Sequence, residues 1–439
     1  MGFELFAVSA PFRQTVLELD AVYAATTGTS LIESTGLFMN TFPPGADTLG
    51  DSWPVSITLP ALTMLQLALV DTLAVIGITP DAVMGHSAGE TVVLSASGSA
   101  SKAAAMELSI ARGRALALVE EAKGTMAALS ASPAEAHKII QSLEAEVGDI
   151  VLEIGCYNSP GAVTLSGLEA HIDLAVSKAN TAGMFARKLK THVPVHSALM
   201  EICRTEFERL VGEVFSRHST SSPTVATFST VTGQLFDGCF DPQYFWDGTR
   251  HPVLFHDAVG SIVSKYEAAT FIEIGPHPVL IGYLKSMTEG LDGFTFTCPL
   301  RRSRALVPEQ KLEPFQLLTT VGEVVIAGHR CVDFDALCGT SVRLTEKLPE
   351  YPFAPKKLPL FFPTHYIAKQ RQHRNGPLNY PQLRINVDTH PGLAGHIIKG
   401  EPIMPAAGFV EMVCSDCTPS TCYNSYHPLG SRVRSYRII

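Results

Sequence analysis

Residues 81–90 read DAVMGHSAGE, a short apolar run followed by a serine between two glycines. The short run of residues 81–84, apolar after Asp81, favours a buried strand, and a helix is expected to begin after Gly89. Glycines on both sides of Ser87 permit a sharp turn that exposes the serine hydroxyl at the end of the strand. The stretch therefore predicts an α/β fold with a nucleophile elbow at Ser87.

The chain around this elbow supports a layered α/β fold. Helical periodicity runs over residues 62–73, and a further helix is expected over residues 102–121, with Ser101 as its N-cap. Up to about residue 300, helices alternate with short β-rich runs. We expect a hydrolase-like large lobe with a parallel sheet.

A compact unit interrupts this pattern at about residues 125–190. Its order is strand, helix, strand, strand, helix, strand, with a turn expected at residues 156–160. Ser132 and Glu135 form a capping-box pattern at the start of its first helix. The order predicts an inserted ferredoxin-like small lobe.

Composition narrows the classes of function. The 439 residues are 46% hydrophobic and carry a net charge of -9, so they offer a large core and no basic face for nucleic acid. The longest apolar stretch, residues 62–78, contains Gln66 and Asp71, and the N-terminus lacks a basic region followed by an apolar run. We expect a cytoplasmic protein that neither binds nucleic acid nor enters a membrane.

The nine cysteines are scattered, and Cys414 and Cys417 form the one close pair. Two more ligands at suitable spacing would be needed for zinc, and Cys422 with His427 completes such a site poorly. No metal site and no disulfide framework are expected.

Several segments stand in order along the chain from the elbow onward. They are GHSAGE at 85–90, YNSPGAVTLSG at 157–167, VPVHS at 193–197, FSTVTG at 228–233 and FIEIGPHPVL at 271–280. Through them the first 300 or so residues resemble the acyltransferase domain, of malonyl-CoA:ACP transacylase type, of an iterative type I polyketide synthase. Without this resemblance, the elbow motif alone would also fit a glycine-rich turn that carries no chemistry.

The resemblance implies a role for two residues beyond Ser87. Arg112, 25 residues after the serine (112 − 87), corresponds to the arginine that holds the substrate carboxylate, which a guanidinium can bind with two parallel hydrogen bonds. His196, 109 residues after it (196 − 87), corresponds to the catalytic base. Arg114 better fits a solvent-exposed side chain, and His192 is a competing histidine.

The implied reaction has two steps. Ser87 attacks a coenzyme A thioester such as malonyl-CoA, and the phosphopantetheine thiol of an acyl-carrier protein then takes the acyl group from the serine ester. Ala88 would supply a backbone N–H to the oxyanion, and Gln66 and Asn158 would line the pocket. His277 would either shape the floor of the cleft or have only a structural role in the turn that contains it. No bound cofactor is expected, and other synthase domains are expected partners.

Both ends of the chain depart from the family pattern. Relatives begin with a strand and a Gly-Gln-Gly-x-Gln loop, whereas this chain opens with text that follows that loop, so a core strand and an oxyanion donor are expected to be missing. Residues 301–380 are rich in spaced prolines and are expected to form an irregular linker.

Residues 381–413 resemble the start of a dehydratase or product-template domain, a double hot-dog fold. The motif contains His396, Gly400 and Pro405, and His396 would be a vestigial dehydratase base because the second half of that fold is absent. Residues 414–439 are off-family, and we expect them to be a disordered tail.

Two alternatives stay open. A serine hydrolase of the α/β type shares the elbow, but it would need an acid and then a histidine after the serine. A non-catalytic synthase fragment would explain the departures at the two ends. The choice between malonyl and methylmalonyl extender units is also open.

Overall fold

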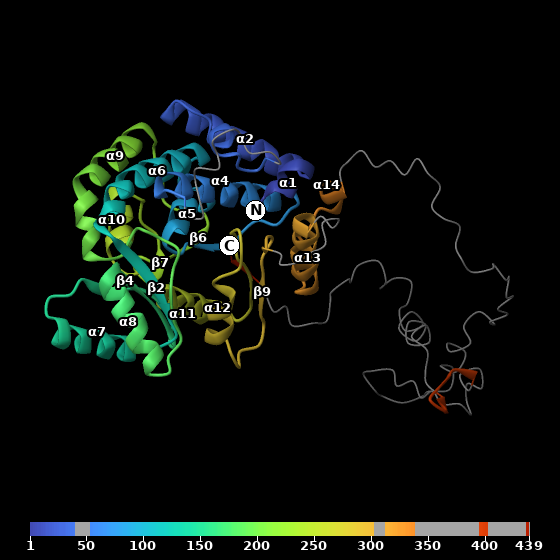
Figure 1. Ribbon diagram of the computed structural model, residues 1–439. Helices are drawn as coiled ribbons and strands as arrows, with labels where there is room; N and C mark the ends of the chain where they lie inside the picture. The colour runs from blue at the N-terminus through green and yellow to red at the C-terminus, as the bar shows by residue number, and fades with distance from the viewer. Residues whose placement is uncertain (40–52, 303–311, 339–394, 403–435, 439) are drawn as a thin grey trace. The chain divides into compact units, whose positions relative to one another are not determined.

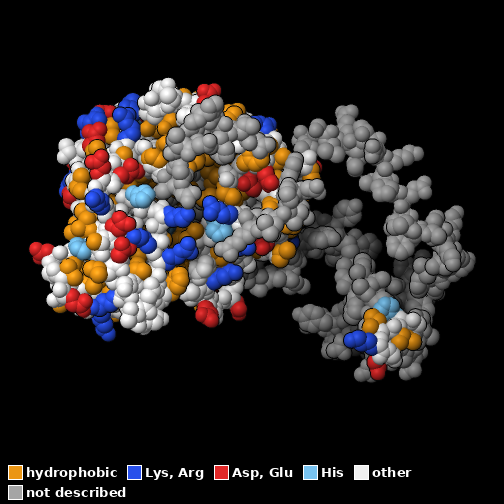
Figure 2. All heavy atoms as spheres, viewed as in Figure 1, with side chains coloured by type: hydrophobic (Ala, Val, Ile, Leu, Met, Phe, Trp, Pro, Cys, Tyr) orange, Lys and Arg blue, Asp and Glu red, His pale blue; other side chains and the backbone are white. Residues whose placement is uncertain are grey.

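The computed structural model describes residues 1–39, 53–302, 312–338, 395–402 and 436–438. Contacts divide the chain into two units, one of residues 1–342 with 433–439 and the other of residues 343–432. The first unit contains all five of the sequence segments quoted above, from residues 85–90 to residues 271–280. Figure 2 shows acidic and basic side chains intermingled over much of the visible face of this unit.

The large lobe is built on a six-stranded sheet with the order β7-β6-β1-β12-β8-β9. All neighbouring strands are parallel except β6 and β7. The parallel sheet expected from the sequence is therefore present. Its strands are β1 (Ala82–Met84), β6 (Ala226–Ser229), β7 (Gln234–Phe236), β8 (Ala269–Ile272), β9 (Phe294–Thr297) and β12 (Tyr436–Ile438).

Helices surround this sheet (Figure 1). The apolar helix α4 is the longest of those described, and its side chains Met64, Leu67 and Ala68 are buried in the core. By length and composition α4 could cross a membrane, but 56% of the relevant window is buried inside the structure, as in a core helix. The helices of the large lobe are α1 (Phe3–Val8), α2 (Ala10–Thr27), α3 (Leu31–Thr35), α4 (Val55–Val75), α5 (Glu90–Ala96), α6 (Lys102–Leu116), α9 (Arg204–Arg217), α10 (Pro242–Arg250), α11 (Phe255–Lys265) and α12 (Ile281–Met287).

The small lobe has the element order expected from the sequence, with a separate sheet of order β3-β4-β2-β5. Ser132 and Glu135 form the predicted capping box. The elements are β2 (Gly124–Leu129), α7 (Pro133–Val147), β3 (Leu152–Ser159), β4 (Ala162–Leu168), α8 (Glu169–Thr181) and β5 (Ala186–Lys188).

The turn expected at residues 156–160 is wrong for most of its length. Strand β3 continues to Ser159, where it still pairs with Ala162 of β4, so only Pro160 and Gly161 connect the strands. Cys156 is buried and pairs with Thr164, which holds this part of the chain in the sheet.

The linker expected to be irregular contains two helices, α13 (Leu312–Ile326) and α14 (Phe334–Cys338). Leu317, Val321 and Val324 lie on one face of α13 and are buried, because the spacing i, i+4, i+7 places them together. The Glu313 carboxylate accepts the backbone N–H of Gly2 at 2.7 Å and of Glu4 at 2.9 Å. These contacts tie α13 to the start of the chain.

Strand β12 corrects two expectations about the ends of the chain. Tyr436, Arg437 and Ile438 pair in parallel with residues 269–271 of β8, and Ile438 also pairs with Ala82 of β1. The sheet thus has a strand between β1 and β8, and the tail has regular structure at residues 436–438. Two facing strand edges carry unpaired backbone groups, which a third strand satisfies.

In the second unit the structure describes a short hairpin, β10 (Ile397–Ile398) and β11 (Glu401–Pro402). Gly400 has a φ of +85° at its turn, a conformation that favours glycine. His396 precedes the hairpin and is exposed. The rest of residues 381–413 lies outside the described residues, so the expected hot-dog fold stays a prediction.

Candidate active site

Ser87 lies three residues after the end of β1, at the first residue of a 3₁₀ turn over Ser87–Gly89 that leads into α5. Its φ of 53° lies in the left-handed region, which costs a residue other than glycine about 1–2 kcal/mol. A Cβ on Gly85 would lie 2.5 Å from the backbone nitrogen of Glu90, so the turn requires glycine there. These features form the predicted nucleophile elbow.

The Ser87 hydroxyl contacts the imidazole of His196, with 2.7 Å between Oγ and Nε2. The other ring nitrogen, Nδ1, lies 2.9 Å from the carbonyl oxygen of His251. A carbonyl can only accept, so Nδ1 carries the proton and Nε2 is free to accept the proton of Ser87. The pair is a serine–histidine dyad oriented by a main-chain carbonyl, as the resemblance implies.

Burial lowers the pKa of His196 to about 3, and the positive charge of Arg112 acts in the same direction. The side chain is only 1% exposed, so its charged form would lose most of its hydration. His196 therefore stays neutral, and able to act as a base, at pH values well below the ordinary pKa of histidine.

This shift predicts an unusual pH dependence of serine acylation. An ordinary histidine base loses activity below about pH 6.5, whereas here kcat/KM for acylation should stay level from pH 8 to about pH 5. The measurement is the rate of acyl-enzyme formation against pH, with circular dichroism at each pH to verify folding. A fall in rate centred between pH 6 and 7 in the folded protein would contradict the prediction.

Arg112 lies in the C-terminal half of α6 and is 3% exposed. Its Nη1 donates to Thr91 Oγ1 and its Nη2 to Thr249 Oγ1, while Nε is buried without a described partner. Burial lowers the pKa of Arg112 to about 10, so the guanidinium is charged at neutral pH. Both of its described hydrogen-bond partners are neutral hydroxyls, which leaves the cation able to bind an anion.

Thr249 connects the cation to the dyad. Its hydroxyl accepts from Arg112, and its carbonyl oxygen accepts the backbone N–H of His196 at 2.9 Å. The backbone of His196 has a φ of 64°, in the left-handed region, and its ring contacts Ser87. The structure thus brings Ser87, Arg112 and His196 into one region, as the resemblance implies.

Asn158 supports the elbow from the small lobe. Its Oδ1 lies 2.9 Å from Nε2 of His86, and its Nδ2 donates to Thr164 Oγ1 at 3.0 Å. Both polar groups of Asn158 have protein partners, and its contact with substrate stays a prediction. Sequence reasoning gave His86 no role, although its place directly before the nucleophile was a signal.

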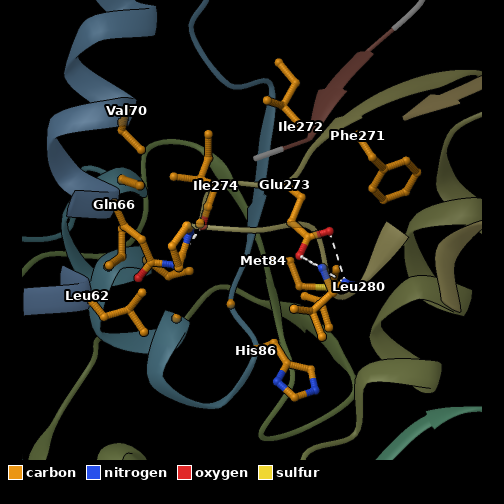
Figure 3. A pocket seen from close by; sticks show the side chains of 18 of the residues that line it. Leu62, Gln66, Val70, Met84, His86, Phe271, Ile272, Glu273, Ile274 and Leu280 are labelled. Carbon is orange, nitrogen blue, oxygen red and sulfur yellow. Dashed lines mark hydrogen bonds between the residues drawn. The ribbon is translucent and has the colours of Figure 1, made fainter. Parts of the chain in front are cut away.

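Gln66 lines a cavity of about 390 Å³ that adjoins the elbow through Gly85, His86 and Gly89 (Figure 3). Its Nε2 donates to the carbonyl oxygen of Ile274 at 2.8 Å, and its Oε1 is buried without a described partner. His277 also lines this cavity. Ser87, Arg112 and His196 are not among the residues that line the cavity, so the cavity lies beside the dyad.

Comparison with known proteins agrees with this geometry. A family profile described as "Acyl transferase domain" matches residues 1–302. The chain belongs to this family. It is 41% identical over 418 residues, 94% of the chain, to a highly reducing polyketide synthase of Strobilurus tenacellus, and 30% identical, over 80% of the chain, to one of Emericella nidulans. The chain spans about 15% of the length of these curated relatives.

Solved structures of acyltransferase domains are similar as well. The domain from the second module of the salinomycin polyketide synthase has a TM-score of 0.65 and 28% identity, covering 80% of this chain and 76% of that one. FabD from Acinetobacter baumannii, at 22% identity and a TM-score of 0.57, covers 74% of this chain and 94% of that one and shares the fold. The matches place this chain with the acyltransferase domains of type I polyketide synthases.

Three other residues named from the sequence are exposed or belong to the second unit. His192 and Arg114 are exposed, and His396 belongs to the second unit. Among the described residues there is no group of three or more side chains that could hold a metal ion. Cys414 and Cys417 lie outside the described residues. The start of a dehydratase domain is not shown by the comparisons and stays a prediction.

Proposed function

We propose that this domain transfers a malonyl-type acyl group from coenzyme A to the phosphopantetheine thiol of an acyl-carrier protein, through an ester on Ser87. The observation that carries the proposal is the 2.7 Å contact of Ser87 Oγ with a neutral His196, beside a buried guanidinium that contacts no described anion. Malonyl-CoA, the carrier protein and further synthase domains are the proposed partners.

In the first half-reaction, His196 Nε2 takes the hydroxyl proton as Ser87 Oγ attacks the thioester carbonyl. The structure gives the backbone N–H of Ala88 no described hydrogen-bond partner, so it is available to the oxyanion at the N-terminal end of the turn. The carbon–sulfur bond then breaks, and His196 returns the proton to the coenzyme A sulfur.

In the second half-reaction, His196 takes the proton of the phosphopantetheine thiol, whose sulfur attacks the ester carbonyl. The bond to Ser87 Oγ breaks and Oγ recovers the proton from His196. The pKa of His196 suits this cycle because the imidazole is neutral at the start of each half. The phosphopantetheine belongs to the acyl-carrier protein, and we propose no cofactor bound to this domain.

Arg112 would hold the free carboxylate of a malonyl-type group during both halves. A buried guanidinium whose described hydrogen bonds go to neutral hydroxyls gains most from an ionised partner with matching bidentate geometry. An acyl group without a carboxylate would leave that charge unpaired, which is a basis for selectivity.

The test is acyl-enzyme mass spectrometry of the purified chain with malonyl-, methylmalonyl- and acetyl-CoA in parallel. We expect a malonyl or methylmalonyl adduct that peptide mapping locates on Ser87, and much less acetyl adduct. An adduct on another residue would overturn the assignment. Absence of any adduct in the folded chain would favour the non-catalytic alternative, and rapid loss of the adduct to water would favour a hydrolase.

A further inference from the structure

Glu90, three residues after the nucleophile, is an ionisable side chain of the site region that the mechanism does not use. It is the first residue of α5 and is 3% exposed. Its Oε1 accepts from Thr230, at 2.9 Å from the backbone N–H and 2.6 Å from the hydroxyl. Its Oε2 accepts the hydroxyl of Tyr244 at 2.9 Å. Oε1 accepts two hydrogen bonds and Oε2 lies within hydrogen-bond distance of a hydroxyl, an arrangement that can hold an ionised carboxylate.

Glu90, on α5, and Arg112, on α6, both form hydrogen bonds with α10, and Arg112 also forms one with α5. On α5, Glu90 is followed directly by Thr91, which accepts from Arg112. On α10, Tyr244 donates to Glu90 and Thr249 accepts from Arg112. The two opposite charges are therefore buried in one region, where each is hydrogen-bonded to different hydroxyl groups, and no direct hydrogen bond between them is described.

The charges influence each other through this region. Burial raises the pKa of Glu90, and the hydrogen bonds from Thr230 and Tyr244 and the charge of Arg112 oppose that rise. The charge of Glu90 in turn opposes the lowering of the Arg112 pKa by burial. Each charge thus makes the other less costly to bury.

We propose that Glu90 is a positioning residue that acts as the resident counter-charge of Arg112 and is opposed by the carboxylate of the incoming acyl group. The inference rests on the proposed function, because that carboxylate is the second anion. While the site is empty, Glu90 stabilises the guanidinium. When substrate arrives, the two negative charges repel each other across Arg112, so Glu90 moderates how tightly carboxylate-bearing acyl groups bind.

The chain offers a variant that changes this charge with little disturbance of shape. In Glu90→Gln the amide oxygen can keep both donors from Thr230. The amide nitrogen can donate to the Tyr244 oxygen, because the Tyr244 hydroxyl has a second acceptor in Ser229 Oγ at 2.8 Å. Tyr244→Phe is the matched control, because it removes one hydrogen bond from the same carboxylate and leaves the charge.

The experiment compares kcat/KM for Ser87 acylation by malonyl-CoA with that by acetyl-CoA in the whole chain. In Glu90→Gln we expect the malonyl-to-acetyl ratio to rise about tenfold, through a lower KM for malonyl-CoA. In Tyr244→Phe the ratio should stay within about twofold of that of the wild type. A purely structural role would lower both rates alike, and an unchanged or lower ratio in Glu90→Gln would overturn the proposal.

Two further measurements separate the possible failures. If the wild type acylates with neither donor, the proposed function fails, and the thermal shift caused by free malonate then tests the charge coupling, with a larger rise in Tm expected for Glu90→Gln than for wild type. If Glu90→Gln does not fold, the double variant Glu90→Gln/Arg112→Gln decides. Restored folding supports a coupled charge pair, and continued failure to fold contradicts it.

Discussion

His196→Gln is expected to slow acylation of Ser87 by malonyl-CoA by about a thousandfold, the usual contribution of a positioned general base. A serine hydroxyl is a weak nucleophile at neutral pH and needs a base. Among the described residues, the base in contact with Ser87 Oγ is His196 Nε2, at 2.7 Å. Glutamine has no basic nitrogen, so the proton of Ser87 Oγ would have to pass to water. The measurement is single-turnover acyl-enzyme formation by mass spectrometry.

His192→Gln is the matched control for this variant, because it makes the same change four residues earlier at an exposed side chain. We expect its acylation rate to lie within about twofold of wild type, as for most surface substitutions. Similar rates for His196→Gln and wild type would contradict the dyad. A large loss in His192→Gln would show that the wrong histidine had been assigned as the base.

Arg112→Gln is expected to lower kcat/KM for malonyl-CoA by about 100-fold or more, since truncating one partner of a buried charge pair typically costs about 2–5 kcal/mol. The acetyl group has no carboxylate for Arg112 to bind. Its kcat/KM should therefore fall far less, or rise because the variant no longer buries an unpaired cation. The ratio of the two values is the decisive quantity, because a general loss of folding would reduce both.

Arg114→Gln is the control, since it removes a charge from the same helix α6 at an exposed position. It should leave the ratio unchanged. An Arg112→Gln enzyme that still prefers malonyl-CoA as strongly as wild type would overturn the assignment of the carboxylate ligand. The outcome also bears on Glu90, whose proposed effect operates through this guanidinium.

Local signals in the sequence were enough to predict the elbow and the element order of the small lobe. The apolar strand, the two glycines around Ser87 and the following helix are all short-range features, and the structure has them as expected. The capping box at Ser132 likewise depends on residues three apart. Such features can be predicted because their energetics involve neighbouring residues.

Long-range contacts explain the expectations that were wrong. Cys156 to Ser159 continue a strand because β4 offers partners across the hairpin, and α13 is ordered by contacts that include Glu313 with the chain start. Strand β12 pairs with β1 and β8, which lie far away in the sequence. None of these pairings leaves a periodic pattern that a single segment would show.

The sequence by itself determined the elbow at Ser87 and the order of elements in the small lobe, because these depend on local turns and periodicity. Only the tertiary structure decided which groups surround the site. The His251 carbonyl that orients His196, the hydroxyls of Thr91 and Thr249 on Arg112, and the buried Glu90 come from separate segments. Burial of these charges and hydrogen-bonding groups in one place is a property of packing, and packing is what sets their protonation and their chemistry.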